Sequence, residues 1–110
     1  MEISTREAYG VLVVDMEGRL DSSTSGYSYD ELVRIAQGSN KNVLINLEKL
    51  EFITSAGLRS LLVAAKLLKN SNGQLKLCSA NNAVNQVLET SGFTSLLNLY
   101  PTESDAIKTF

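Results

Sequence analysis

Residues 52–62 form the stretch that decides this fold, Phe52-Ile53-Thr54-Ser55-Ala56-Gly57-Leu58-Arg59-Ser60-Leu61-Leu62. The apolar run at 43–47 precedes it and a long amphipathic segment begins within it, so Thr54 and Ser55 fall where a strand is followed by a helix. The first turn of a helix has unpaired backbone N–H groups and partial positive charge from the peptide dipoles. A phosphate on Ser55 would be tolerated there and would add about −1.5 to −2 charge to an exposed surface. The stretch therefore predicts a site of modification rather than a catalytic centre.

Five segments of the chain have the composition of β-strands. They are apolar or β-branched and are bounded by turn-forming residues. Helices are expected between the last three, so these three should be parallel, whereas the two opening strands are joined by the turn Tyr9-Gly10 and make the sheet mixed. The expected strands are Ile3–Ala8, Val11–Val14, 43–47, Gln74–Cys78 and Leu96–Tyr100.

Four segments have the spacing or the caps of helices. The stretch Ser28-Tyr29-Asp30-Glu31 has the form of a capping box, so the first helix should begin there and end near Gly38. The later helices are expected at about 56–70, around Val84, Val87 and Leu88 with a stop at Gly92-Phe93, and after a Thr102 cap with Ala106, Ile107 and Phe110. The predicted fold class is thus a single α/β domain with a mixed sheet of about five strands and about four helices.

Composition limits the class of protein. The chain of 110 residues is long enough for one domain, 1–110, with its own core. Its formal net charge is −2 and it has no block of Lys or Arg, so no nucleic-acid partner is expected. Cys78 is the single cysteine, which favours a reducing compartment. The chain has no apolar run of the roughly 18 residues that span a bilayer and no leader, so we expect a cytoplasmic protein without direct membrane insertion.

An enzymatic role is disfavoured by what the sequence lacks. It contains no histidine, which removes the commonest general base and the commonest zinc ligand. Neither a Gly-x-Ser-x-Gly hydrolase motif nor a glycine-rich nucleotide-binding motif is present. We therefore expect no catalytic residue, no cofactor and no metal, and a phosphate on Ser55 would have to come from another protein.

The motif Ile53-Thr54-Ser55-Ala56-Gly57-Leu58-Arg59, with Gly18-Arg19-Leu20-Asp21 upstream, resembles a STAS domain (sulfate transporter and anti-sigma factor antagonist). The resemblance covers Val11 to Phe110. Within that family, the chain is most similar in length to single-domain bacterial anti-anti-sigma factors. It implies a STAS-like fold and phosphorylation of Ser55 by an anti-sigma factor that is also a serine kinase, with the unphosphorylated form binding that kinase. A separate phosphatase would reset the protein. Many members carry an aspartate where this chain has Thr54, so Thr54 is a rival phosphosite.

The resemblance also implies a docking surface for the kinase, formed by the loop after the second strand and the start of the second long helix. Its expected members are Asp21, Ser22, Thr24, Thr54, Ala56, Gly57, Leu58 and Arg59.

Each of these residues also has a purely structural interpretation. Thr54 or Ser55 could be only an N-cap, and Asp21 only a turn residue. Arg59, four residues after Ser55, could pair with a phosphate or with a partner acid, or simply be solvated. Among functions, the alternative is a phosphorylation-independent STAS adaptor subunit of a membrane lipid-transport or transporter complex. A small-ligand sensor is a third hypothesis.

Overall fold

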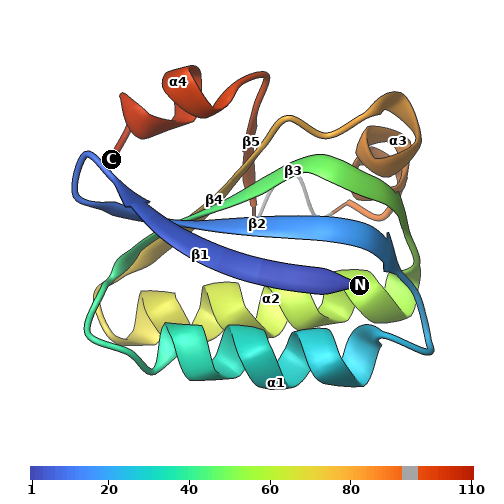
Figure 1. Ribbon diagram of the computed structural model, residues 1–110, viewed down its shortest axis with the longest axis horizontal. Helices are drawn as coiled ribbons and strands as arrows, with labels where there is room; N and C mark the ends of the chain where they lie inside the picture. The colour runs from blue at the N-terminus through green and yellow to red at the C-terminus, as the bar shows by residue number, and fades with distance from the viewer. Residues whose placement is uncertain (93–96) are drawn as a thin grey trace.

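The computed structural model describes residues 1–92 and 97–110 of the chain, with a mixed sheet in the order β1-β2-β3-β4-β5 (Figure 1). β1 pairs with β2 in antiparallel register, and the neighbours β2–β3, β3–β4 and β4–β5 are parallel. The fold class predicted from the sequence is confirmed. In chain order the elements are β1 (Glu2–Ala8), β2 (Val11–Leu20), α1 (Ser25–Ala36), β3 (Asn42–Ile53), α2 (Ser55–Asn70), β4 (Gln74–Cys78), α3 (Asn82–Thr90), β5 (Asn98–Tyr100) and α4 (Glu103–Ile107).

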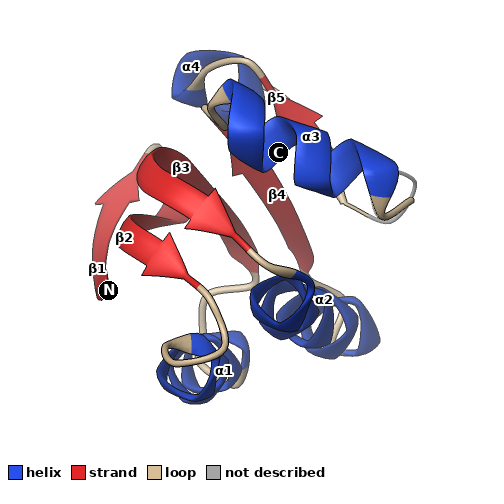
Figure 2. Cartoon of the chain, turned by 90° about the vertical axis from the view of Figure 1, so that its right-hand side faces the viewer, coloured by secondary structure: helices blue, strands red, loops and turns tan. Residues whose placement is uncertain are grey.

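The helices lie on both sides of the sheet. α1 and α2 run side by side against one face, and the buried residues of α3, Val84 and Leu88, belong to the same core. α4 lies on the other side of the sheet (Figure 2). Side chains alternate between the two faces along β2: Val14 and Met16 join the core beneath α1 and α2, whereas Val11 and Val13 join a smaller cluster with Ala106 of α4. Cys78 is buried in that smaller cluster, where it acts as a small core residue.

β2 and β3 are longer than the predicted strands, and this difference positions the site. The predicted strand was the compact apolar run that ends at Leu47, and the residues after it do not alternate between apolar and polar. The structure explains the irregular spacing: β3 carries an extra residue opposite β2 at two places, so the register shifts and Leu47, Leu50 and Ile53 are all buried. Asn46 stabilises the first irregularity, since its side-chain oxygen accepts a hydrogen bond from the Glu48 N–H at 2.9 Å.

The outer part of β3 extends past β4 and is bordered by the start of α3 instead. Asn81 is the N-cap of α3 and accepts a hydrogen bond from the N–H of Val84 at 2.8 Å. Its amide nitrogen donates to the carbonyl oxygens of Leu50 at 3.1 Å and Glu51 at 3.3 Å. One asparagine thus begins a helix and satisfies carbonyl groups of the strand that leads to Thr54.

The predicted start of α1 was wrong. α1 begins at Ser25, and the Ser25 N–H donates to the Asp21 carbonyl at 2.8 Å, so the turn after β2 continues directly into the helix. Ser28 is therefore not an N-cap but a buried residue inside α1, where it faces α2. The sequence pattern was misleading because a serine that packs between two helices looks the same as one that caps a helix.

The remaining boundaries agree closely with the prediction or differ at an end. α2 begins one residue earlier than expected, and the Thr102 cap of α4 is confirmed by a hydrogen bond from the Asp105 N–H at 3.1 Å. α4 ends at Ile107, so Phe110 lies beyond it and instead packs its ring 4.7 Å from the Lys76 ammonium. Phe93, part of the predicted helix stop, and the predicted strand start at Leu96 lie outside the described residues.

α2 approaches the end of β2 so closely that only glycine fits at position 57. A Cβ atom on Gly57 would lie 2.7 Å from the Leu20 carbonyl oxygen and 2.5 Å from its Cγ atom. Because the oxygen belongs to the backbone, it cannot move aside without displacing β2. Gly57 is thus present for close approach, despite the cost of about 1 kcal/mol that glycine carries inside a helix.

We predict that Gly57→Ala lowers the free energy of unfolding by about 1–3 kcal/mol, because the new methyl group overlaps Leu20. Gly26, in the first turn of α1, is the matched control: a Cβ atom there has nothing within 4 Å. Gly26→Ala should leave stability unchanged or raise it by up to ~1 kcal/mol. Urea denaturation of both variants measures the difference, and equal effects would show that the contact with Leu20 is unimportant.

A buried pair of hydroxyls joins α1 to α2. Ser28 and Ser60 are both buried, with their Oγ atoms 3.1 Å apart, and Ser60 also donates to the Gly57 carbonyl at 2.6 Å. Since the Ser60 proton goes to Gly57, Ser28 must donate to Ser60. The pair is therefore asymmetric: Ser60 has two partners and Ser28 has one.

This asymmetry predicts unequal costs for removing the two hydroxyls. Ser60→Ala leaves the Ser28 hydroxyl buried without its acceptor and should cost about 1–3 kcal/mol, whereas Ser28→Ala should cost about 1 kcal/mol or less. The double variant should be less destabilised than the sum of the two. Chemical denaturation as a double-mutant cycle tests this. A larger cost for Ser28→Ala than for Ser60→Ala would contradict the assigned direction of the hydrogen bond.

Candidate functional site

The candidate site lies where β2 and β3 end next to each other. Leu20 and Ile53 are register partners, and the Thr54 N–H donates to the Leu20 carbonyl at 2.9 Å. The loop that begins at Asp21 and the helix that begins at Ser55 therefore leave the sheet from adjacent points (Figure 2). Crevices outside the carboxyl ends of parallel strands are the usual place for binding sites in α/β folds.

Thr54 and Ser55 have different surroundings although they are neighbours. Thr54 is the N-cap of α2, with extended backbone, and its half-buried hydroxyl oxygen accepts a hydrogen bond from the Gly57 N–H at 3.2 Å. Ser55 is the first residue of α2, is exposed, and its hydroxyl makes no hydrogen bond to any residue that the structure describes. Of the two hydroxyls considered from the sequence, Thr54 is thus the cap and Ser55 is the accessible group.

The loop after β2 is organised around Asp21. Its carboxylate accepts hydrogen bonds from the backbone N–H and the hydroxyl of Ser23, at 2.9 and 2.6 Å. Thr24 closes the turn, because its hydroxyl donates to the Arg19 carbonyl at 2.8 Å and accepts from the Asp21 N–H at 3.0 Å. The two bonds from Ser23, with that from its hydroxyl foremost, hold the pKa of Asp21 below its usual value, with a smaller contribution from the Arg19 charge. Asp21 therefore has the turn role that the sequence allowed, and its contact with a partner stays a prediction.

The predicted docking residues divide into exposed and buried groups. Ser22, Ala56 and Arg59 are exposed, and Asp21 and Thr24 are half-buried, so all five can present atoms to a partner. Gly57 and Leu58 belong to the interior instead. They shape the surface by holding α2 against β2, and a direct contact through the Leu58 side chain would require α2 to move.

Sequence reasoning missed an aromatic residue beside this surface. Phe52 is 37% exposed, and the Arg19 guanidinium carbon lies 5.3 Å from the centre of its ring. The two residues are register partners near the ends of β3 and β2. The sequence offered no clear signal, because Phe52 lies beside the apolar Ile53 and the pairing depends on the irregular register of β3.

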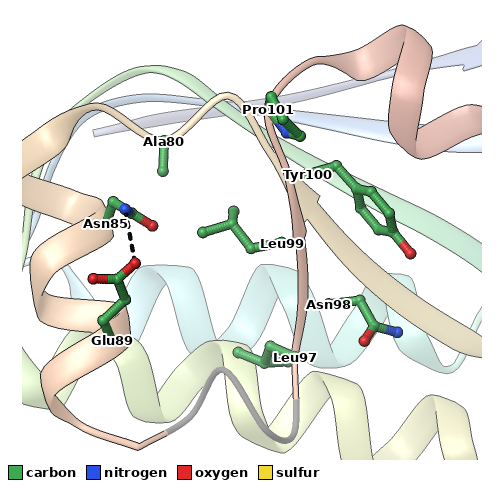
Figure 3. A pocket seen from close by; sticks show the side chains of 8 residues that line it. All are labelled: Ala80, Asn85, Glu89, Leu97, Asn98, Leu99, Tyr100 and Pro101. Carbon is green, nitrogen blue, oxygen red and sulfur yellow. Dashed lines mark hydrogen bonds between the residues drawn. The ribbon is translucent and has the colours of Figure 1, made fainter.

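A separate hollow of about 660 Å³ lies between α3 and β5 (Figure 3). Asn85 and Glu89 point toward it from α3 and are hydrogen bonded to each other at 3.2 Å, opposite Leu97 and Leu99. None of the residues predicted to be functional lines it. It is therefore a second surface feature rather than part of the site at the start of α2.

Other features that would indicate chemistry or membrane association are lacking in the described part of the chain. No group of three or more His, Cys, Asp or Glu side chains within 1–92 and 97–110 is placed to hold a metal ion. Burial raises the pKa of Cys78 to about 11, so its thiol is protonated at neutral pH and is a poor nucleophile. No helix of these residues has the length and apolar character needed to cross a bilayer.

Sequence comparison identifies relatives along most of the chain. A Bordetella bronchiseptica protein named as an anti-sigma factor antagonist, BtrV, is 32% identical over 96 residues, which cover 87% of this chain and 83% of the relative. An anti-sigma F factor antagonist of Paenibacillus polymyxa is 29% identical over 110 residues, covering 97% of this chain and 92% of that protein.

Solved structures share the fold. An anti-sigma factor antagonist from Mycobacterium paratuberculosis superposes with a TM-score of 0.89 at 24% identity, covering 98% of this chain and 92% of that one. The phosphorylated form of the Bacillus cell fate determinant SpoIIAA gives a TM-score of 0.72 at 21% identity, with 98% of each chain covered.

The family itself follows from a match over almost the whole length. The sequence model of the STAS domain matches residues 2–106, which include every strand and both helices at the candidate site. The chain therefore belongs to the STAS domain family.

Proposed function

We propose that this protein is an anti-sigma factor antagonist controlled by phosphorylation of Ser55. In its unphosphorylated form it binds an anti-sigma factor that is also a serine kinase, which frees a sigma factor and raises sigma-dependent transcription in the cytoplasm. The main observation behind this proposal is that the Ser55 hydroxyl, at the start of α2, is exposed and makes no hydrogen bond to any residue that the structure describes. The names of the two relatives and the phosphorylated form of SpoIIAA support the same role.

The chemistry of phosphate transfer would belong to the partner. A hydroxyl can attack the γ-phosphorus of ATP only when a base accepts its proton and Mg²⁺ neutralises the phosphate charge, and a kinase supplies both. The Ser55 oxygen would form the new bond to phosphorus, and ADP would leave. This chain has no histidine, and its contribution is to present Ser55 on an exposed helix start. It therefore acts as a substrate and not as an enzyme, and a phosphatase would reverse the step.

Phosphate at this position would weaken binding without unfolding the protein. The start of a helix accepts negative charge, and Thr54, not Ser55, holds the cap of α2. In a docked complex, however, the added charge of about −1.5 to −2 would have to be desolvated or would face like charges. A loss of about 3–4 kcal/mol corresponds to a 100- to 1000-fold weaker complex.

We predict that incubation with the cognate kinase and ATP adds one phosphate, on Ser55. Thr54 is the rival acceptor, but its oxygen is half-buried and bonded to the Gly57 N–H. Intact mass and peptide mapping identify the site. Ser55→Ala should abolish incorporation, whereas Thr54→Ser, which keeps the capping hydroxyl, should preserve it. Phosphate on Thr54 alone, or within residues 22–28, would show that the site is wrongly assigned.

A further prediction separates the switch from the adaptor. Ser55→Ala removes the phosphate acceptor from an exposed position and should leave partner affinity within about 3-fold of wild type, since the shape and charge of the surface are kept. After treatment with active kinase and ATP, wild type should lose its partner while Ser55→Ala should keep it. Calorimetry before and after treatment measures both. Equal retention, with phosphorylation of wild type verified by mass, would contradict the switch and favour the phosphorylation-independent adaptor.

A further inference from the structure

Arg59 is placed to meet a phosphate carried by Ser55. The two residues are four apart on α2, a spacing that brings side chains to the same helix face with Cβ atoms about 5–6 Å apart. Both are exposed. The Arg59 guanidinium has no hydrogen bond, ion pair or ring contact with any residue in 1–92 or 97–110, so it is available.

The charges at the start of α2 favour such a pair. The first turn of α2 contains no acidic residue, although a helix start is stabilised by negative charge. A phosphate on Ser55 would supply that charge. An anion that precedes a cation by four residues is also the more favourable order, because both charges then agree with the helix dipole.

Among the charged groups near Ser55, Arg59 is the principal candidate to pair with a phosphate on that residue. Arg19 already lies over the Phe52 ring and lowers the pKa of Asp21 from nearby. Asp21 itself carries a negative charge on the adjacent loop, which would push a phosphate away from that loop and toward α2. Lys66, the next cation along α2, lies seven residues beyond Arg59, about two helical turns away.

We propose that Arg59 binds the phosphate of phosphorylated Ser55 within the same molecule. This deepens the proposed function and rests on it: phosphorylation would add negative charge and would also withdraw the Arg59 guanidinium from the docking surface. An acidic group of the partner that pairs with Arg59 in the unphosphorylated complex would then lose its cation. Arg59 is a positioning residue here and takes no part in phosphate transfer.

The test uses full-length protein with phosphoserine installed at position 55 during synthesis, so that it does not depend on any kinase. The second ionisation of phosphoserine, with a pKa of about 6, is followed by ³¹P NMR. We expect Arg59→Gln to raise this pKa by about 0.3–0.5, because the nearby cation stabilises the dianion. Lys66→Gln removes the same charge eleven residues, about three turns, from position 55 and should leave this pKa nearly unchanged, and Arg59→Lys should recover part of the effect. Circular dichroism confirms that each variant is folded.

The outcomes separate this inference from the proposed function. Equal pKa values for wild type and Arg59→Gln, or equal effects of Arg59→Gln and Lys66→Gln, would overturn the pairing even if phosphorylation still weakens kinase binding. Conversely, a raised pKa in Arg59→Gln alone would support the pairing even if no kinase modifies Ser55. In that case the pair would be a property of α2, and the regulatory role would be contradicted by the kinase experiment described above.

Discussion

The geometry of the candidate site depends on the contact between the start of α2 and the end of β2. The backbone carbonyl of Leu20 makes it in two ways: it accepts the Thr54 N–H, and it occupies the space where a side chain at position 57 would be. This contact brings the Asp21 loop beside Ser55. Because both participants are backbone, the geometry tolerates changes of the surface side chains around it but not a larger residue at Gly57.

Small polar residues extend this contact into the helical layer. The hydroxyls of Ser28 and Ser60 lie between α1 and α2, and Ser60 also bonds the carbonyl of Gly57. The start of α2 is thereby joined to both β2 and α1, while the larger side chains of α2, Leu58, Leu61 and Leu68, pack against the sheet. The proposed docking surface, built from the Asp21 loop and the start of α2, therefore rests on packed elements, and such preorganisation would lower the entropy cost of binding a partner.

The sequence predicted the fold well where local patterns are regular. Alternating or β-branched runs and the 3.6-residue stripe of α2 placed the elements, and hydroxyl residues before helices placed the caps of α2 and α4. It failed where tertiary contacts override local pattern. Residues 48–53 were not recognised as part of β3 because the register of that strand is irregular, and the buried Ser28 resembled an N-cap. For the site, the sequence identified the two neighbouring hydroxyls, but their different roles depend on which one points to the Gly57 N–H. The pairing of Arg19 with Phe52 depends on strand register and was not accessible.

The different roles of Thr54 and Ser55 would allow one short segment to serve both folding and the proposed regulation. The β-branched threonine suits the extended backbone of the cap position and holds the helix start through its oxygen. Ser55 is one residue further on, and its hydroxyl makes no hydrogen bond within residues 1–92 and 97–110, so a group added to it need not disturb the cap. Many STAS sequences carry an aspartate at the position of Thr54, which would cap the helix equally well but would place a negative charge beside the serine. A neutral cap in this chain leaves Arg59 as the nearest charge on α2, so the charges of α2 itself favour a phosphate on Ser55.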